Sequence, residues 1–138
     1  LAVILYSGGT TGMPKGIMLS NYNFISEGLM VAHWAGLDAR YPRMLAVLPI
    51  FHGFGLGVCV NTMLMAGGTC IMVPRFEPRE IAGIIKKKKP NYIIGPPTLF
   101  AALNRNEDFA RTDLSCLRAA VSGADSLPKA VKIRPAIP

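Results

Sequence analysis

Residues 69–95 read TCIMVPRFEPREIAGIIKKKKPNYIIG, and this stretch decides the fold class. It begins and ends with short runs, residues 69–73 and 92–95, that are apolar nearly throughout instead of alternating. Runs of this kind indicate strands covered on both faces, as in a parallel sheet. Between them, Pro78 suits the first turn of a helix that stops before Pro90. The stretch therefore predicts a strand–helix–strand unit.

The same alternation continues in both directions along the chain. Similar apolar runs, which we interpret as strands of the same sheet, occupy residues 2–6, 44–48 and 117–121. Further helices are expected from Ser20 or Asn21 to about Ala35, over residues 55–66, and from Pro97 onward. The order predicts an α/β fold with an open, mostly parallel, doubly wound sheet and helices on both faces. Ligands of such sheets bind at the carboxyl ends of the strands.

The most informative loop follows the first apolar run, at residues 6–16, and reads YSGGTTGMPKG. Glycines allow the backbone to approach a ligand closely, and successive N–H groups can form a nest for anionic oxygens. Hydroxyls and a lysine add donors and positive charge. The loop is not a Walker A sequence, because Pro14 precedes Lys15 and Gly16 follows it. It nevertheless contains the groups needed to hold a polyphosphate.

This string resembles the phosphate-loop signature of the acyl-CoA synthetase, or adenylate-forming, superfamily of AMP-dependent ligases. The usual form has Thr where this chain has Ser7, and Ser where it has Gly8, so one hydroxyl is kept and one is lost. Two further segments agree in order and spacing. Residues 48–55, with Phe51 and His52, resemble the second core motif, and residues 122–128 resemble the segment beside the adenine of ATP.

The resemblance implies a two-step reaction in which ATP and a carboxylic acid, expected to be a fatty acid, give an acyl-adenylate and then an acyl-CoA. It implies ATP, CoA and Mg²⁺ as ligands, with His52 orienting groups near the acyl pocket and the CoA tunnel. The residues expected at the nucleotide are Ser7, Gly8, Gly9, Thr10, Thr11, Gly12, Lys15, Gly123, Ala124 and Asp125. Lys15 would act in catalysis by neutralising the leaving pyrophosphate, and the Ser7 hydroxyl would help to hold Mg²⁺.

The resemblance covers residues 1–132, as a fragment of the AMP-binding N-terminal domain, whereas residues 133–138 do not resemble the family and are expected to be a foreign tail. The family's acidic metal-binding motif, ribose-binding Asp and catalytic Lys normally lie beyond residue 138. We therefore expect the fragment alone to be inactive.

The composition agrees with an anionic ligand but does not identify one. The chain has 138 residues and a formal net charge of +7, and residues 86–89 supply four of its fifteen cations. This run is expected to be a solvated helix end, with contact to CoA phosphates or a membrane surface as the alternative. Basic and aromatic residues do not interleave, so nucleic acid is not an expected partner.

The apolar segment 44–73 is interrupted by Pro49, His52, Asn61 and glycines, so a membrane span is not expected and any membrane contact would be peripheral. The cysteines, Cys59, Cys70 and Cys116, are odd in number and lack CxxC spacing. This pattern indicates reduced core residues of a cytoplasmic protein and gives no zinc site. Trp34 and the methionines are also expected in the core.

Two other functions stay open on the sequence alone. A peptide-synthetase adenylation domain would share the phosphate loop, but such domains usually have Phe-Asp where this chain has Phe51-His52. A non-catalytic fragment that binds nucleotide would also share it. For His52 and Asp125, roles as a core histidine and as a turn residue are the alternatives to roles in the site.

Overall fold

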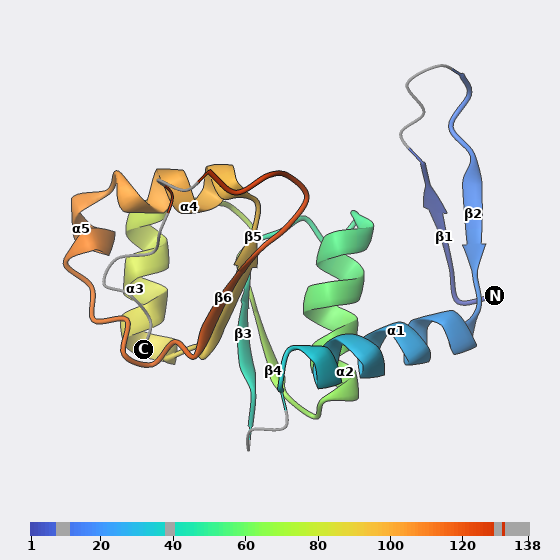
Figure 1. Cartoon of the computed structure of the whole chain (residues 1–138), viewed down its shortest axis with the longest axis horizontal. Helices are drawn as coiled ribbons and strands as arrows, with labels where there is room; N and C mark the ends of the chain where they lie inside the picture. The colour runs from blue at the N-terminus through green and yellow to red at the C-terminus, as the bar shows by residue number, and fades with distance from the viewer. Residues whose placement is uncertain (8–11, 38–40, 129–130, 132–138) are drawn as a thin grey trace.

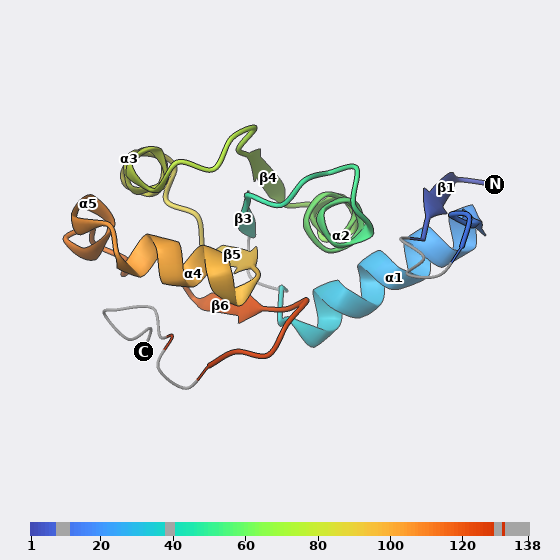
Figure 2. The ribbon, with the colours of Figure 1, turned by 90° about the horizontal axis from the view of Figure 1, so that it is seen from above.

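The protein is described by a computed structural model that covers residues 1–7, 12–37, 41–128 and 131. Its main body is a parallel sheet with the strand order β4-β3-β5-β6. The strands are β3 (Arg43–Ala46), β4 (Thr69–Met72), β5 (Tyr92–Gly95) and β6 (Ala119–Ser122). Helices cover both faces of this sheet (Figures 1 and 2). The predicted α/β fold with a doubly wound parallel sheet is therefore confirmed.

The order in which the helices connect the strands explains why the helices form two layers, one on each face of the sheet. The π-helix η1 (Phe54–Asn61) and α2 (Thr62–Met65) lead from β3 to β4, and α3 (Pro78–Lys88) leads back past β3 to β5. The helices α4 (Pro97–Asn104) and α5 (Glu107–Ala110) then lead to β6. Because the direction across the sheet reverses after β4, right-handed crossovers require the helices to change face there.

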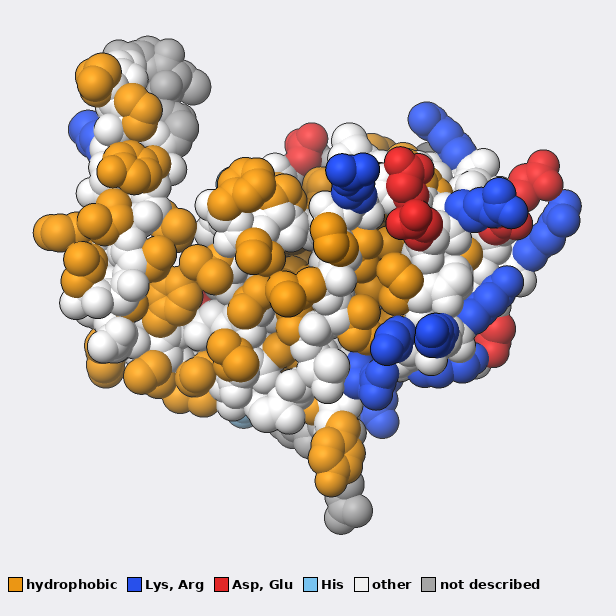
Figure 3. Space-filling model, turned by 180° about the vertical axis from the view of Figure 1, so that it is seen from behind, with side chains coloured by type: hydrophobic (Ala, Val, Ile, Leu, Met, Phe, Trp, Pro, Cys, Tyr) orange, Lys and Arg blue, Asp and Glu red, His pale blue; other side chains and the backbone are white. Residues whose placement is uncertain are grey.

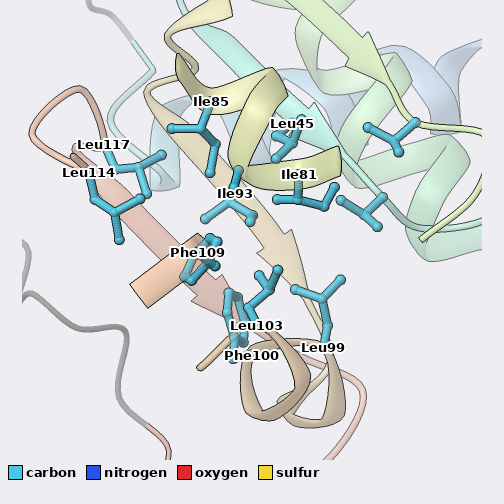
Figure 4. Close-up of a cluster of buried hydrophobic side chains, with 13 residues drawn as sticks. Leu45, Ile81, Ile85, Ile93, Leu99, Phe100, Leu103, Phe109, Leu114 and Leu117 are labelled. Atoms are coloured by element: carbon cyan, nitrogen blue, oxygen red, sulfur yellow. The ribbon is translucent and has the colours of Figure 1, made fainter. Parts of the chain in front are cut away.

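The two faces of the sheet are buried in two separate cores. On one face, Leu45 and Ile93 contact side chains of α3, α4 and α5, including Ile81, Leu103 and Phe109 (Figure 4). These five side chains are fully buried. Because successive strand residues point to opposite faces, the neighbours of Leu45 and Ile93 belong to the other core.

The second core is formed by Met44 and Ile94 with residues of η1 and α2, including Cys59 and Met63. Burial on both faces explains why the strands are apolar throughout, which is the pattern seen at residues 69–95. It also fixes the register of β3, β4, β5 and β6 and therefore the place where their carboxyl ends meet.

The amino ends of three strands are joined by one side chain and its backbone. Asn91 Oδ1 accepts a hydrogen bond from Arg43 N at 2.6 Å, and Asn91 N donates to Arg43 O at 2.9 Å. Asn91 O accepts from Arg118 N at 2.8 Å. These bonds connect the starts of β3, β5 and β6, so Asn91 orders the edge of the sheet opposite to the carboxyl ends.

Helix α1 (Asn21–Trp34) begins where the sequence predicted, with Ser20 as its N-cap. Ser20 Oγ accepts from Asn23 N at 3.1 Å, and Asn23 Oδ1 accepts from Ser20 N at 2.9 Å. This reciprocal pair satisfies backbone donors that a helix otherwise leaves free, and it stabilises the start of the helix by about 1 kcal/mol.

The prediction that the first apolar run joins the parallel sheet was wrong. Strand β1 (Val3–Tyr6) pairs antiparallel with β2 (Gly16–Leu19), which the sequence analysis did not predict, in a separate two-stranded sheet (Figure 1). Residues 7–15 are too few for the crossover, usually a helix, that a parallel pair requires. The polyphosphate loop is therefore the end of a β-hairpin.

The core assignment of Trp34 and of several methionines was also wrong for this chain. Trp34 is 77% exposed, and Met13, Met18, Met30 and Met72 are exposed as well. Met44 and Met63 are buried as expected. Trp34, Met13, Met18 and Met30 lie on the hairpin or α1, where the sequence pattern gave no information about which apolar face is covered.

A matched pair of leucines tests the first core. Leu103→Ala removes a fully buried side chain and is expected to lower the free energy of unfolding by about 2–5 kcal/mol. Leu64→Ala, at a helical position that is 68% exposed, is expected to change it by less than about 0.5 kcal/mol. Urea unfolding followed by circular dichroism measures both, and equal losses would contradict the core described above.

The cysteines provide a second test. Burial, with a smaller contribution from the nearby Cys70, raises the pKa of the Cys59 thiol to about 12. Because the thiolate is the reactive form, Cys59 should resist alkylation by iodoacetamide at pH 8 in the folded protein. It should react after unfolding in urea, as peptide mass spectrometry can show. Rapid labelling of native Cys59 would contradict its position in the second core.

Candidate functional site

The start of η1 lies between the other two segments that the sequence analysis selected. A Cβ atom built on Gly53 would lie 3.2 Å from Leu5 Cδ1 of the hairpin. A Cβ atom built on Gly123, just after β6, would lie 2.8 Å from Phe54 Cζ. The neighbouring residues Gly53 and Phe54 therefore contact the hairpin on one side and the end of β6 on the other.

The start of η1 and the segment after β6 meet at the carboxyl edge of the parallel sheet. Strand β5 ends at Gly95, whose carbonyl accepts a hydrogen bond from Gly123 N at 3.2 Å, and β3 leads directly into residues 47–53. The free end of the hairpin lies on the same side of the molecule as these carboxyl ends (Figure 1). This is the edge at which open α/β sheets bind their ligands.

The segment after β6 has the features of a backbone that is shaped for close approach. Gly123 has no room for a side chain because the Phe54 ring lies against it. Ala124 has a φ of 69°, a left-handed conformation that is unusual for a residue with a Cβ atom. Ser122 Oγ is buried and has no hydrogen-bond partner among the described residues. A buried hydroxyl without a partner is costly, so this edge offers a polar contact to a ligand.

Asp125 is exposed, and its Oδ1 accepts a hydrogen bond from Ser126 N at 2.6 Å. This bond agrees with the role of a turn residue, which the sequence analysis left open. The other carboxylate oxygen, Oδ2, does not take part in the bond to Ser126 N. The carboxylate lies three residues beyond β6, at the same edge as Gly123 and Ala124.

His52 is exposed and is held by the turn that precedes η1. Its Nδ1 accepts a hydrogen bond from Phe54 N at 3.1 Å, and its backbone N–H donates to Pro49 O at 3.2 Å. With Nδ1 as the acceptor, the neutral ring carries its proton on Nε2. The core-histidine alternative does not agree with this exposure, and the geometry suits a group that orients a ligand by donating from Nε2.

The π-helix η1 has close contacts at both of its ends. A Cβ atom on Gly55 would lie 2.2 Å from Pro49 O, so only glycine fits there. At the other end, buried Asn61 donates through Nδ2 to Phe24 O at 2.6 Å and to Glu27 Oε2 at 2.9 Å. These bonds tie η1 to α1. π-Helical segments are rare and frequently occur at functional sites.

The polyphosphate loop is only partly described. Gly8, Gly9, Thr10 and Thr11 lie outside the described residues. Ser7 N donates to Lys15 O at 2.9 Å, and Lys15 N approaches Ser7 Oγ at 3.4 Å, so these two residues close the hairpin. The amide of Ser7 is thereby used within the hairpin and is not available to a phosphate.

Gly12 and Lys15 are exposed beyond the paired part of the hairpin. A Cβ atom on Gly12 would meet no heavy atom within 4 Å, so this part of the backbone is open to a ligand. Lys15 is likewise exposed, immediately before the start of β2.

Cavities flank the start of η1 on two sides. One of about 190 Å³ lies between the hairpin, α1 and η1, and its lining is mostly apolar apart from Glu27 and Asn23. A second, of about 440 Å³, follows the carboxyl ends of β3 and β4 and includes Phe51. Residues 49–57 thus contribute to both hollows.

The described residues contain no group of three or more His, Cys, Asp or Glu side chains that could hold a metal ion. The one residue of this chain that the sequence analysis assigned to Mg²⁺ is Ser7, through its hydroxyl oxygen, a ligand type that suits Mg²⁺. Among the described helices, none has the length and apolar character needed to cross a bilayer.

Comparison with known proteins identifies the class to which this fold and site belong. The sequence model described as "AMP-binding enzyme" matches residues 1–135, and the chain therefore belongs to the AMP-binding enzyme family. The chain is 36% identical, over 133 residues, to a long-chain-fatty-acid–CoA ligase of Bacillus subtilis (strain 168). The matched region covers 96% of this chain and 24% of that protein. The chain thus spans about a quarter of the length of the curated relatives it matches.

Two solved structures share the fold. The inhibitor-bound N-terminal domain of FACL13 from Mycobacterium tuberculosis superposes with a TM-score of 0.79 at 28% identity, over 93% of this chain and 32% of that one. ATP-bound MatB from Rhodopseudomonas palustris superposes with a TM-score of 0.77 at 31% identity, over 88% and 24%. The sheet and its helices are therefore part of the N-terminal domain of an adenylate-forming enzyme, and the relatives are acid–CoA ligases.

Sequence reasoning missed two residues of this edge. Phe54 was included only as part of a motif, although its ring lies against Gly123. Ser122 was quoted without a role, although its buried hydroxyl lacks a partner among the described residues. The glycine at position 123 was the available signal, because a glycine after a buried strand often marks close contact with another group.

The contact between Gly123 and Phe54 can be tested by a double-mutant cycle. Gly123→Ala places a methyl group about 2.8 Å from Phe54 Cζ and is expected to destabilise the protein by about 1–3 kcal/mol. In a Phe54→Ala background the same substitution should cost much less, because the ring is gone. Thermal unfolding of the four proteins measures the coupling, and additive effects would contradict the contact.

Proposed function

We propose that the polypeptide containing this chain is an AMP-forming acid–CoA ligase that uses ATP to activate a carboxylic acid, most simply a fatty acid. The observation that supports the proposal is the contact of residues 53 and 54 with Leu5 of the hairpin on one side and with Gly123, at the carboxyl edge, on the other. The Ser122 hydroxyl and the exposed, left-handed backbone at Ala124 suit a nucleotide. The fatty acid is supported by the name of the Bacillus subtilis relative and by the apolar cavities beside η1.

In the first step, a carboxylate oxygen of the acid attacks the α-phosphorus of ATP. The bond from that phosphorus to the bridging oxygen breaks, and pyrophosphate leaves with the electron pair. The chemical requirement is stabilisation of negative charge on a crowded phosphate chain. Residues Ser7 to Gly12 would hold the β- and γ-phosphates through side-chain hydroxyls and backbone amides, and Lys15 would neutralise the leaving pyrophosphate.

Gly123, Ala124 and Asp125 would contact the adenine side of the nucleotide. Mg²⁺, held in part by Ser7 Oγ, would supply positive charge between phosphate oxygens when bound.

In the second step, the sulfur of CoA attacks the carbonyl carbon of the acyl-adenylate, and AMP leaves. His52 lies at the start of η1 beside Phe54, and its Nε2–H points away from the turn that holds Nδ1. We assign it an orienting role at the acyl group and the incoming thiol instead of a role as general base. Phe51-His52 in place of Phe-Asp supports a CoA ligase over a peptide-synthetase adenylation domain.

The chain is proposed to be part of a larger folded enzyme and to be inactive alone. The hairpin and α1 expose many large apolar side chains on one side of the molecule, including Met18, Tyr22, Leu29 and Trp34 (Figure 3). Patches of this extent usually mark a contact with another part of a protein. This surface argues against the alternative of a self-contained nucleotide-binding module. A cytoplasmic location is proposed on the free cysteines.

The assignment of the phosphate loop is tested in the longest polypeptide that contains this chain. Lys15→Ala combined with Thr11→Ala should lower acid-dependent pyrophosphate release by about 100-fold or more, because charge stabilisation of the leaving group is lost. Arg105→Ala, which removes an exposed cation from the end of α4, should leave the rate unchanged. An unaltered rate in the double variant would reject the roles of Lys15 and Thr11.

A further inference from the structure

The amino edge of the sheet, opposite to the candidate site, carries a concentrated positive surface. Helix α3 ends in Lys86, Lys87 and Lys88, and Lys89 follows in a left-handed conformation with a φ of 48°. All four lysines are exposed. Lys and Arg side chains gather on the part of the surface remote from the hairpin (Figure 3).

Tertiary structure adds arginines to this run that are distant in the sequence. Asn91, two residues beyond Lys89, is bonded to the backbones of Arg43 and Arg118 at 2.6 Å and 2.8 Å. Arg118 is exposed and Arg43 is partly buried. We call Lys86, Lys87, Lys88, Lys89, Arg43 and Arg118 the basic edge.

Little negative charge offsets the basic edge. Asp113 Oδ2 lies 4.0 Å from Lys89 Nζ, and both side chains are more than half exposed. Hydrogen bonding to Ser115, with a smaller contribution from Lys89, keeps the pKa of Asp113 below its usual value, so this carboxylate is ionised and offsets one cation. The other ion pairs of the described residues, Arg79–Asp108 and Arg111–Glu107, do not involve the basic edge.

The basic edge has more positive charges than are required to complement the dipole of α3. One or two positive charges in the last turn of α3 already complement the negative end of the helix dipole. The candidate site lies at the carboxyl ends of the strands, across the sheet from the basic edge, so the remaining charge is not adjacent to that site. If the basic edge is a binding site, its ligand is therefore an anion other than the nucleotide or CoA.

We propose that the basic edge docks the protein on the surface of a membrane that contains anionic phospholipids. Clusters of four to eight Lys or Arg residues are attracted to such surfaces without a specific pocket, and lysine, a strongly hydrated point charge, suits contact with many headgroups. Tyr41, which precedes Arg43 by two residues and is 79% exposed, adds a side chain that partitions to the headgroup region. Nucleic-acid sites more often combine Arg with several aromatic stacking residues, whereas four of the six cations of the basic edge are lysines and Tyr41 is a single aromatic side chain beside them.

Docking in this orientation leaves the carboxyl edge of the sheet, with His52 and Lys15, facing away from the lipid. Binding to the membrane would therefore not obstruct entry of water-soluble ligands at the candidate site. The proposal does not depend on the proposed ligase function, since it uses neither the site nor its substrates.

The test is co-sedimentation of the longest polypeptide containing this chain with vesicles. Vesicles of phosphatidylcholine with phosphatidylglycerol should bind the protein in about 0.1 M salt and release it in about 1 M salt, where the screening length is about 3 Å. Vesicles of phosphatidylcholine alone should bind far less. Lys87→Ala with Lys88→Ala should lower the partition coefficient roughly 25-fold, about fivefold for each lysine.

A matched variant separates local attraction from net charge. Arg79→Ala with Arg105→Ala also removes two exposed cations, but from the other end of α3 and from the end of α4. This variant should keep nearly wild-type binding to the anionic vesicles. Unchanged thermal unfolding of both variants would show that neither effect reflects loss of the fold.

Three results would overturn the proposal. The first is no binding of the wild-type protein to anionic vesicles at low salt. The second is an equal loss of binding in the Lys87/Lys88 and Arg79/Arg105 variants, which would assign binding to net charge alone. The third is binding of a single-stranded or duplex oligonucleotide that depends on Lys87 and Lys88, combined with no binding to vesicles, which would assign the surface to nucleic acid.

Discussion

Burial of both faces of one small parallel sheet is the constraint on which the rest of the molecule depends. Leu45 and Ile93 face one core, and their neighbours Met44 and Ile94 face the other, so no strand can shift by one residue without exposing an entire row of apolar side chains. The fixed register places the ends of β3, β5 and β6 side by side. The candidate site at the carboxyl edge and the basic edge at the amino ends both follow from that alignment.

The site itself is built from close contacts at three glycines. Gly55 lies against Pro49 O, Gly123 against the Phe54 ring, and Gly53 against Leu5. Each contact joins segments that are remote or differently folded: a turn, a strand end and a hairpin. The glycines therefore determine how tightly the start of η1 fits between the two motifs proposed to hold the nucleotide, while Asn61 fixes the far end of η1 to α1.

The chain has an apolar surface and a basic surface, and the two suit different kinds of partner. The apolar side formed by the hairpin and α1 fits a protein whose remaining mass packs there, as the proposed larger enzyme would supply. The basic edge is hydrophilic and belongs to the opposite end of the sheet, so it can stay exposed in a larger enzyme and meet an anionic surface. The separation allows a nucleotide site and a docking surface to coexist without competing for the same residues.

The sequence by itself determined the local elements and the family. Apolar runs that did not alternate predicted buried parallel strands, proline and serine positions predicted the ends of α1, α3 and α4, and the string from Tyr6 to Gly16 indicated the AMP-binding family that the comparison confirmed. These properties depend on residues close together in the chain, where propensity, capping and spacing act directly. The roles of the individual site residues stay predictions.

Tertiary structure alone decided which elements meet. It paired β1 with β2 as a hairpin and not with the main sheet, because the segment between them is too short for a parallel crossover. It left Trp34 exposed, brought Phe54 against Gly123, and placed Arg43 and Arg118 beside the lysines of α3. Such contacts join residues tens of positions apart, and a linear pattern of polarity does not specify which apolar face or which charge is covered by a distant segment.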